Sequence, residues 1–154
     1  YIKTMRKYYL IGNWKLNPTS LKEAEKLASS IVVGIKKLRA NNVEVVVCPP
    51  DTYLAKVKDK VSKNLKLGAQ NAYFEDSGAF TGETSPKVLR DLDCSYVIVG
   101  HSERREYFGE TDEMVKEYSN LFNKMIASAT DASLWFDDTR VFCLCFFACT
   151  CFAL

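Results

Sequence analysis

Four short apolar runs, each followed by a segment with helical periodicity, constrain the fold of this 154-residue chain more than any other feature. The runs cover residues 8–13, 43–48, 65–70 and 95–99. They show little polar alternation, which is typical of strands that are buried on both faces. Alternating strands and helices predict a parallel sheet built from βα units, so we expect an α/β fold.

Helix start signals follow three of these runs. Ser20 and Glu23 form a capping box, and the helix after them carries apolar residues at i, i+3, i+4 spacing, which predicts one buried face. Ser85 precedes Pro86, a proline suited to the first helical position, and Thr111 is expected to cap a later helix. A short helix is also expected within residues 53–61, after a proline pair, and residues 71–85 are expected to form a loop.

Composition excludes several classes of protein. The net charge of +2 gives no reason to expect a nucleic-acid partner. The longest uncharged apolar stretch, residues 141–154, is shorter than the roughly 17–25 residues of a membrane helix, so we expect no membrane-spanning helix. No Gly-x-Gly-x-x-Gly follows a strand, and residues 1–9 lack the apolar core of a signal peptide. We therefore expect a cytoplasmic protein without a nucleotide cofactor or metal.

Polar residues follow three of the four predicted strands. Ligands of parallel sheets lie at the carboxyl ends of the strands. Together these residues supply a cation, amides, an imidazole and an acid, which suits a small anionic substrate. They are Asn13, Lys15, Gln70, Asn71, His101, Ser102, Glu103 and Arg104.

Each of these residues also has a purely structural interpretation. Lys15 could be a solvated lysine at a strand terminus. His101, the single histidine, could be a hydrogen-bonded structural residue. Glu103 and Arg104 could form an ordinary surface pair. Spacing alone does not choose between these interpretations and a binding site.

Six motifs narrow the choice. They stand in the order Gly12-Asn-Trp-Lys-Leu-Asn17, Cys48-Pro-Pro50, Gly68-Ala-Gln-Asn71, Gly78-Ala-Phe-Thr-Gly-Glu83, Tyr96-Val-Ile-Val-Gly-His-Ser-Glu-Arg-Arg105 and Phe108-Gly-Glu-Thr-Asp-Glu113. Over residues 6–118 the chain resembles the N-terminal half of triosephosphate isomerase. The resemblance implies a dimeric, cofactor-free (β/α)8 barrel that interconverts dihydroxyacetone phosphate and D-glyceraldehyde 3-phosphate, in glycolysis and gluconeogenesis.

The length of the chain conflicts with a complete barrel. A closed eight-unit barrel takes about 250 residues, and about 200 at the low end. We therefore expect an incomplete TIM-type (β/α) barrel of about four βα units, followed by an atypical C-terminal tail over residues 119–154.

The resemblance also implies roles for the polar residues. Asn13 and Lys15 bind the substrate, and Lys15 supplies positive charge toward the phosphate and the developing enediolate. His101 is the electrophile that polarises the carbonyl, as the neutral imidazole that a helix N-terminus favours. Residues in supporting positions are Ser102, Glu103, Arg104 and Gln70.

The loop Gly78–Glu83 resembles the family's dimer loop, which inserts into the partner subunit. The resemblance places Phe80, Thr81, Gly82 and Glu83 in this loop, with Thr81 at its tip. An alternative is an ordinary surface loop held by a buried Phe80.

The general base is missing from these motifs. In the family it is a glutamate in a Tyr-Glu-Pro-Val-Trp segment followed by a mobile lid, and the 154 residues contain neither. Proton abstraction beside a carbonyl requires such a base, so we expect this chain alone to be inactive. The alternatives are a non-catalytic half-barrel that pairs with intact subunits, and a non-functional fragment.

The tail, residues 119–154, differs in composition from the rest of the chain. It is rich in phenylalanine and contains Cys143, Cys145, Cys149 and Cys151, whereas Cys48 and Cys94 stand alone and are expected to be small buried residues. Four interpretations compete: an artefact of gene prediction or reading frame, a fifth strand over Val141–Phe147, a metal site, and an acylated or membrane-dipping tail. The cysteine spacing does not match common zinc sites.

Overall fold

The computed structural model describes residues 8–37, 42–61, 65–128 and 140–143, with side chains as far as residue 120. Its elements are β1 (Tyr8–Asn13), α1 (Leu21–Lys37), β2 (Val43–Cys48), η1 (Asp51–Tyr53), α2 (Leu54–Lys58), β3 (Leu65–Ala69), α3 (Pro86–Asp91), β4 (Cys94–Val99), α4 (Ser102–Phe108), α5 (Asp112–Ser128) and β5 (Arg140–Cys143). The four predicted strands are confirmed, with bounds that agree to within one residue.

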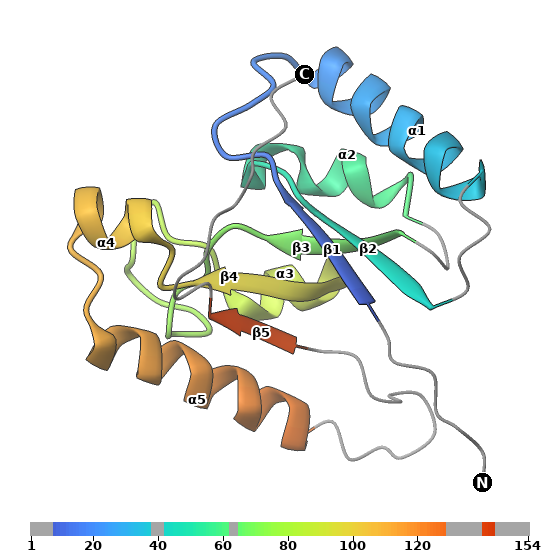
Figure 1. The fold of residues 1–154 in the computed structure, drawn as a ribbon. Helices are drawn as coiled ribbons and strands as arrows, with labels where there is room; N and C mark the ends of the chain where they lie inside the picture. Colours follow the sequence, from blue (N-terminus) through green and yellow to red (C-terminus); the bar gives the residue numbers. More distant parts are fainter. Residues whose placement is uncertain (1–7, 38–41, 62–64, 129–139, 144–154) are drawn as a thin grey trace, which may run out of the picture.

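The strands form one parallel sheet in the order β1-β2-β3-β4-β5 (Figure 1). Asn13 pairs with Cys48 and Ala69 pairs with Val97, so the carboxyl ends of the strands lie along one edge. The predicted α/β fold, an incomplete TIM-type barrel, is confirmed: four parallel strands with their helices form a curled half-barrel. β5 adds a fifth strand beside β4, as one interpretation of the tail expected, and the rest of that predicted strand lies outside the described residues.

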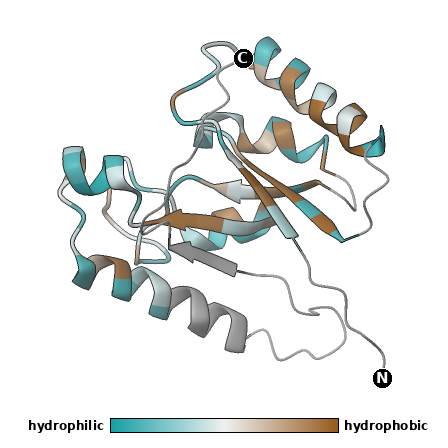
Figure 2. Cartoon of the chain, viewed as in Figure 1, coloured by the Kyte–Doolittle hydropathy of each residue, from teal (hydrophilic) through white to brown (hydrophobic). Residues whose placement is uncertain are grey.

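The main core lies between one face of the sheet and the helices. Alternate residues of β2, β3 and β4 point into it, and α1, α2, α3 and α5 cover it. Its buried members are Ala28, Val45, Val47, Leu54, Val57, Leu65, Leu67, Ala69, Ala72, Leu89, Val97, Val99, Val115 and Tyr118. Figure 2 shows hydrophobic residues along the central strands, whereas α4 beside them is hydrophilic.

The opposite face of the sheet has its own small core of Val46, Cys48, Tyr96 and Ile98, all buried. β3 has only Gly68 at its centre, where an added Cβ would lie 2.6 Å from Cys48 Sγ. Tyr96 therefore spans this strand, and its hydroxyl donates a hydrogen bond to Glu44 Oε1 on β2. The small residue on β3 allows β2 and β4 to interact directly.

The predicted helix caps are present. Ser20 Oγ accepts from the Glu23 N–H at 3.3 Å, and Ser85 Oγ accepts from the Lys87 N–H at 3.2 Å. Thr111 Oγ1 accepts from the Met114 N–H at 3.3 Å. These bonds satisfy amides that the first helical turn leaves without a partner. In the part of the chain that the structure describes, no helix has the length and apolar character to cross a bilayer.

Candidate active site

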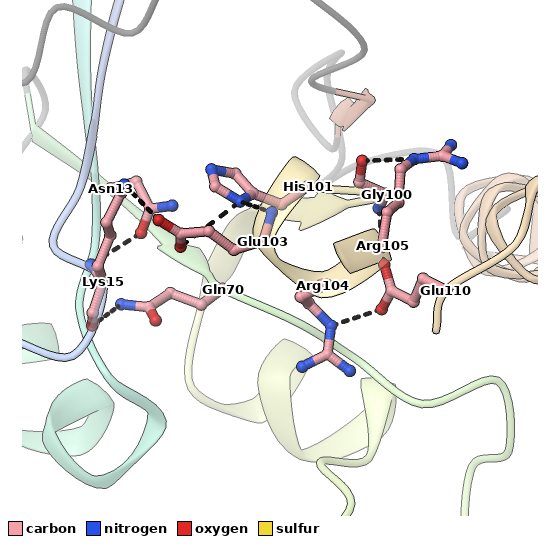
Figure 3. A network of polar contacts seen from close by, with 9 residues as sticks. All are labelled: Asn13, Lys15, Gln70, Gly100, His101, Glu103, Arg104, Arg105 and Glu110. Carbon is pink, nitrogen blue, oxygen red and sulfur yellow. Dashed lines mark hydrogen bonds and ion pairs between the residues drawn. The ribbon is translucent and has the colours of Figure 1, made fainter. Parts of the chain in front are cut away.

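The carboxyl ends of β1, β3 and β4 bring together side chains that are far apart in the sequence (Figure 3). Asn13 ends β1, Lys15 follows it, Gln70 follows β3, and His101 follows β4. Glu103, on the first turn of α4, points back toward Lys15. Most of the residues that sequence analysis selected at the strand ends therefore share one site.

Lys15 has an unusual backbone. Its φ of 54° lies in the left-handed region, which costs a residue with a Cβ about 1–2 kcal/mol. Two hydrogen bonds hold it there: Asn13 Oδ1 accepts from the Lys15 N–H at 2.9 Å, and Gln70 Nε2 donates to the Lys15 carbonyl at 2.8 Å. Gln70 Nε2 also donates to the Cys48 carbonyl, at 2.8 Å. Gln70 thereby ties the ends of β1 and β2 to β3.

The Lys15 ammonium forms an ion pair with Glu103, with Nζ 2.5 Å from Oε1. The two side chains are 37% and 42% exposed, so water screens their attraction. A small anion could reach the ammonium from solvent, where it would share Lys15 with the carboxylate. Lys15 is therefore a positively charged group held beside Glu103 rather than a freely solvated one.

His101 caps α4. Its Nδ1 accepts a hydrogen bond from the Glu103 N–H at 3.2 Å, and its side chain is 14% exposed. Glu103 Oε2 also lies 3.7 Å from Nδ1, a contact that becomes an ion pair only if the ring is protonated. Because Nδ1 accepts from a backbone amide, this network assigns the proton of a neutral ring to Nε2. The imidazole can then donate a hydrogen bond from Nε2.

Glu110 and Arg105 belong to the surroundings of His101, although sequence analysis did not select them. The Glu110 side chain is fully buried, accepts from Arg104 Nε at 2.5 Å, and accepts from the Gly100 N–H at 3.2 Å. Arg105 Nε donates to the Gly100 carbonyl at 2.9 Å. Both lie within the motifs of the family resemblance, but their spacing indicates no role, because both act on the backbone of a neighbouring turn.

Asp51 is a third residue that sequence analysis missed. It follows Pro49 and Pro50 at the end of β2, and this position at a strand end was the available signal. The Thr84 hydroxyl donates to Asp51 Oδ2. Burial raises the pKa of Asp51, while the Thr84 hydrogen bond and the positive charge of Arg104 oppose that rise. The pair fastens the end of the 71–85 loop to the turn after β2.

The loop Gly78–Glu83 is exposed. Phe80 is 40% exposed and its ring centroid lies 4.7 Å from that of Tyr73. The alternative with a buried Phe80 is therefore wrong. The Glu83 N–H donates to the Phe80 carbonyl at 3.1 Å, which closes a turn around Thr81 and Gly82. None of these four loop residues forms a hydrogen bond or ion pair with the strand-end site in the described contacts. Ser102 is also exposed, at the start of α4.

Cys48 is buried and Cys94 is partly buried, and both are free thiols. Burial raises the pKa of each to about 12, so neither is a ready thiolate or metal ligand at neutral pH. Among the described residues, no cluster of three His, Cys, Asp or Glu side chains could hold a metal ion. The side chains of the tail cysteines lie outside the described part, so the metal-site interpretation of the tail is not addressed by this geometry.

Comparisons of the sequence with known proteins identify the family of this chain. A family model described as triosephosphate isomerase matches residues 8–128. Curated proteins named triosephosphate isomerase from Endomicrobium trichonymphae, Alkaliphilus oremlandii and Coprinopsis cinerea are 44%, 53% and 50% identical over 91%, 73% and 71% of this chain. The matches cover 51%, 44% and 43% of those relatives, so the chain spans about half of their length. By the extent of the family match and these identities, the chain belongs to the triosephosphate isomerase family.

Proposed function

We propose that the strand-end site binds a small phosphorylated triose and polarises its carbonyl, as one half of the site that interconverts dihydroxyacetone phosphate and D-glyceraldehyde 3-phosphate. The observation that carries this proposal is the placement of Lys15 and His101 at one edge of the sheet, with His101 Nδ1 accepting from the Glu103 N–H. A proton on Nε2 gives the ring a donor for a carbonyl oxygen. The Lys15 ammonium supplies the charge that an anionic substrate requires.

The chemistry assigns a role to each group. When a base removes a proton from the carbon beside the carbonyl, negative charge develops on the carbonyl oxygen, and a hydrogen bond from His101 Nε2 stabilises it. Lys15 stabilises the same charge and the phosphate. Asn13 and Gln70 hold the backbone of Lys15, and Glu103 holds its ammonium. Arg104 supports the turn before His101 through Glu110, and Ser102 begins the helix that follows His101.

We propose that the 154-residue polypeptide by itself has no meaningful isomerase activity. The printed sequence contains no Tyr-Glu-Pro-Val-Trp segment to supply the base. Loss of a general base alone costs on the order of 10²–10⁴-fold in rate. The polypeptide should be produced in a host that lacks its own isomerase and assayed with glyceraldehyde 3-phosphate. Turnover at rates near those of full-length relatives, abolished by His101→Gln, would contradict this proposal.

A second candidate function is a non-catalytic half-barrel that pairs with intact subunits, or a homodimer as in the family. The exposed loop around Phe80 and Thr81 favours it. The test is co-purification of the tagged chain with an intact isomerase subunit. Thr81→Arg should abolish the complex, and Thr52→Arg, at an exposed threonine on η1, should leave it intact. Failure of the unaltered chain to co-purify would leave the fragment without a pairing function.

The expected cytoplasmic location and the place of the reaction in glycolysis and gluconeogenesis are proposals that follow from family membership.

The boundary predicted at residue 118, with a tail unlike the family over residues 119–154, is also a proposal. The family model matches ten residues further, to residue 128. Sequencing the transcript across the codons for Tyr118–Leu154 tests it. A frame that continues into a Tyr-Glu-Pro segment would remove the tail, and a transcript that reads as printed would retain it.

A further inference from the structure

The turn between β4 and α4 depends on one glycine. Gly100 has a φ of 64°, in the left-handed region, and connects Val99 to His101. A Cβ added at Gly100 would lie 2.8 Å from Val115 Cγ2 on α5 and 3.1 Å from Arg105 Nη2. Only glycine fits this turn, yet glycine is also the residue with the greatest backbone freedom. Glycine has no side chain that could fix the direction in which the backbone continues to His101, so other groups must fix it.

Two charged side chains hold Gly100 from its two sides. The buried Glu110 accepts the Gly100 N–H through Oε2, at 3.2 Å. Arg105 donates from Nε to the Gly100 carbonyl, at 2.9 Å, and this carbonyl belongs to the peptide that joins Gly100 to His101. Fixing both peptide planes fixes φ and ψ of the residue between them.

Glu110 and Arg105, which we call the two clamps of Gly100, are themselves held in place. Glu110 Oε1 accepts from Arg104 Nε at 2.5 Å, and the Glu110 N–H donates to the Arg104 carbonyl at 3.3 Å. Arg105 Nη1 donates a hydrogen bond to Oδ1 of Asp112, the first residue of α5, at 2.7 Å. The Arg105 N–H donates to the His101 carbonyl at 3.0 Å. Neither clamp touches the imidazole in the described contacts.

We propose that Glu110 and Arg105 are positioning residues for His101, because they fix the Gly100 backbone and thereby keep Nδ1 of the ring on the Glu103 amide. The consequence is a defined tautomer, with the proton of the neutral ring on Nε2. The importance of that tautomer for catalysis rests on the proposed function. The positioning itself does not, and it can be measured without substrate.

The test is nuclear magnetic resonance on the full 154-residue chain labelled with 15N. The single histidine gives one imidazole spin system, so its two nitrogens need no assignment against other rings. Long-range 1H–15N spectra of the unaltered chain at a pH where the ring is neutral should show an acceptor Nδ1 and a protonated Nε2. Hydrogen exchange of the Glu103 amide should be slow.

Glu110→Gln retains the size of the side chain but leaves one carbonyl oxygen for two donors. We expect a mixture of tautomers at His101, and at least a tenfold faster exchange of the Glu103 amide relative to the Val97 amide of β4. Arg105→Lys removes the Nε donor, leaves no buried carboxylate without a partner, and should produce the same signature. It therefore also serves if Glu110→Gln fails to fold.

Val57→Ala is the matched control, because it weakens the core beside α2 without contacting Gly100. It should speed exchange at Glu103 and Val97 together and leave the tautomer unchanged. A single Nε2–H tautomer in folded Glu110→Gln and Arg105→Lys, with an unchanged exchange ratio, would overturn the proposal. That result would leave the proposed function standing, because the tautomer and the exchange ratio are both measured without substrate.

Discussion

Gly68→Ala tests the packing of β3 beneath the site. An added Cβ would lie 2.6 Å from Cys48 Sγ, and 3.2 Å from both Tyr96 Cβ and Val46 Cγ1. Cys48 and Val46 have no exposed surface, so neither can move into solvent. Overpacking of this kind costs about 1–3 kcal/mol, and the lower chain entropy of alanine in the unfolded state offsets about 0.4–1 kcal/mol. We expect a net destabilisation of about 1–2 kcal/mol.

The assay is equilibrium urea unfolding of the 154-residue chain, with the midpoint and slope fitted together. Gly34→Ala is the control, because an added Cβ at this position in α1 meets nothing within 4 Å. In a helix interior that change should stabilise the chain by about 0.5–1 kcal/mol. The two variants make the same chemical change and should shift the midpoint in opposite directions.

The double variant Gly68→Ala/Cys48→Ala identifies the clash. Removing Sγ makes room for the new methyl group, so the double variant should be at least about 1 kcal/mol more stable than the sum of the single changes predicts. Independent sites add to within about 0.3–0.5 kcal/mol. If the two changes in the free energy of unfolding simply add, Cys48 Sγ is not the atom that excludes a side chain at residue 68, and the reasoning is refuted.

The remaining predictions concern a cap, an ion pair and the buried thiols. Ser85→Ala removes the Oγ that accepts from the Lys87 N–H and donates to the Asp76 carbonyl, and should lower the free energy of unfolding by about 1 kcal/mol. Ser29→Ala, at an exposed position of α1, should not lower it. Glu103→Gln should change the free energy of unfolding by less than about 1 kcal/mol in urea, because the pair with Lys15 is partly solvated, and a loss above about 2 kcal/mol would contradict that view. The pKa values of Cys48 and Cys94 are raised from 9.0 to about 12, so their contribution to stability is complete below pH 9 and is lost as pH rises toward 12. Urea unfolding from pH 8 to 11 should show this fall, by up to about 1.4 kcal/mol per pH unit for each thiol, and Cys48→Ala should make the fall less steep.

Much of the fold was predictable because its signals are local. The apolar runs identified four strands, and Ser20, Ser85 and Thr111 identified helix starts through side-chain bonds that span only two or three residues. The motifs around Lys15 and His101 predicted the family. The family model matched, and the structure brought these two residues to one edge of the sheet.

The sequence by itself determined four strands, most of the helices, the parallel character of the sheet and the polar residues at the strand ends, because periodicity, caps and strand termini are properties of neighbouring residues. Only the tertiary structure decided which polar groups meet. Gln70 reaches the Lys15 carbonyl across 55 positions, and Glu103 reaches the Lys15 ammonium across 88. Likewise, Glu110 holds Gly100 because the fold buries its side chain beside that residue, which its position in the sequence does not indicate. Such choices depend on how the sheet curls and on how closely helices pack beside it, which no local pattern specifies.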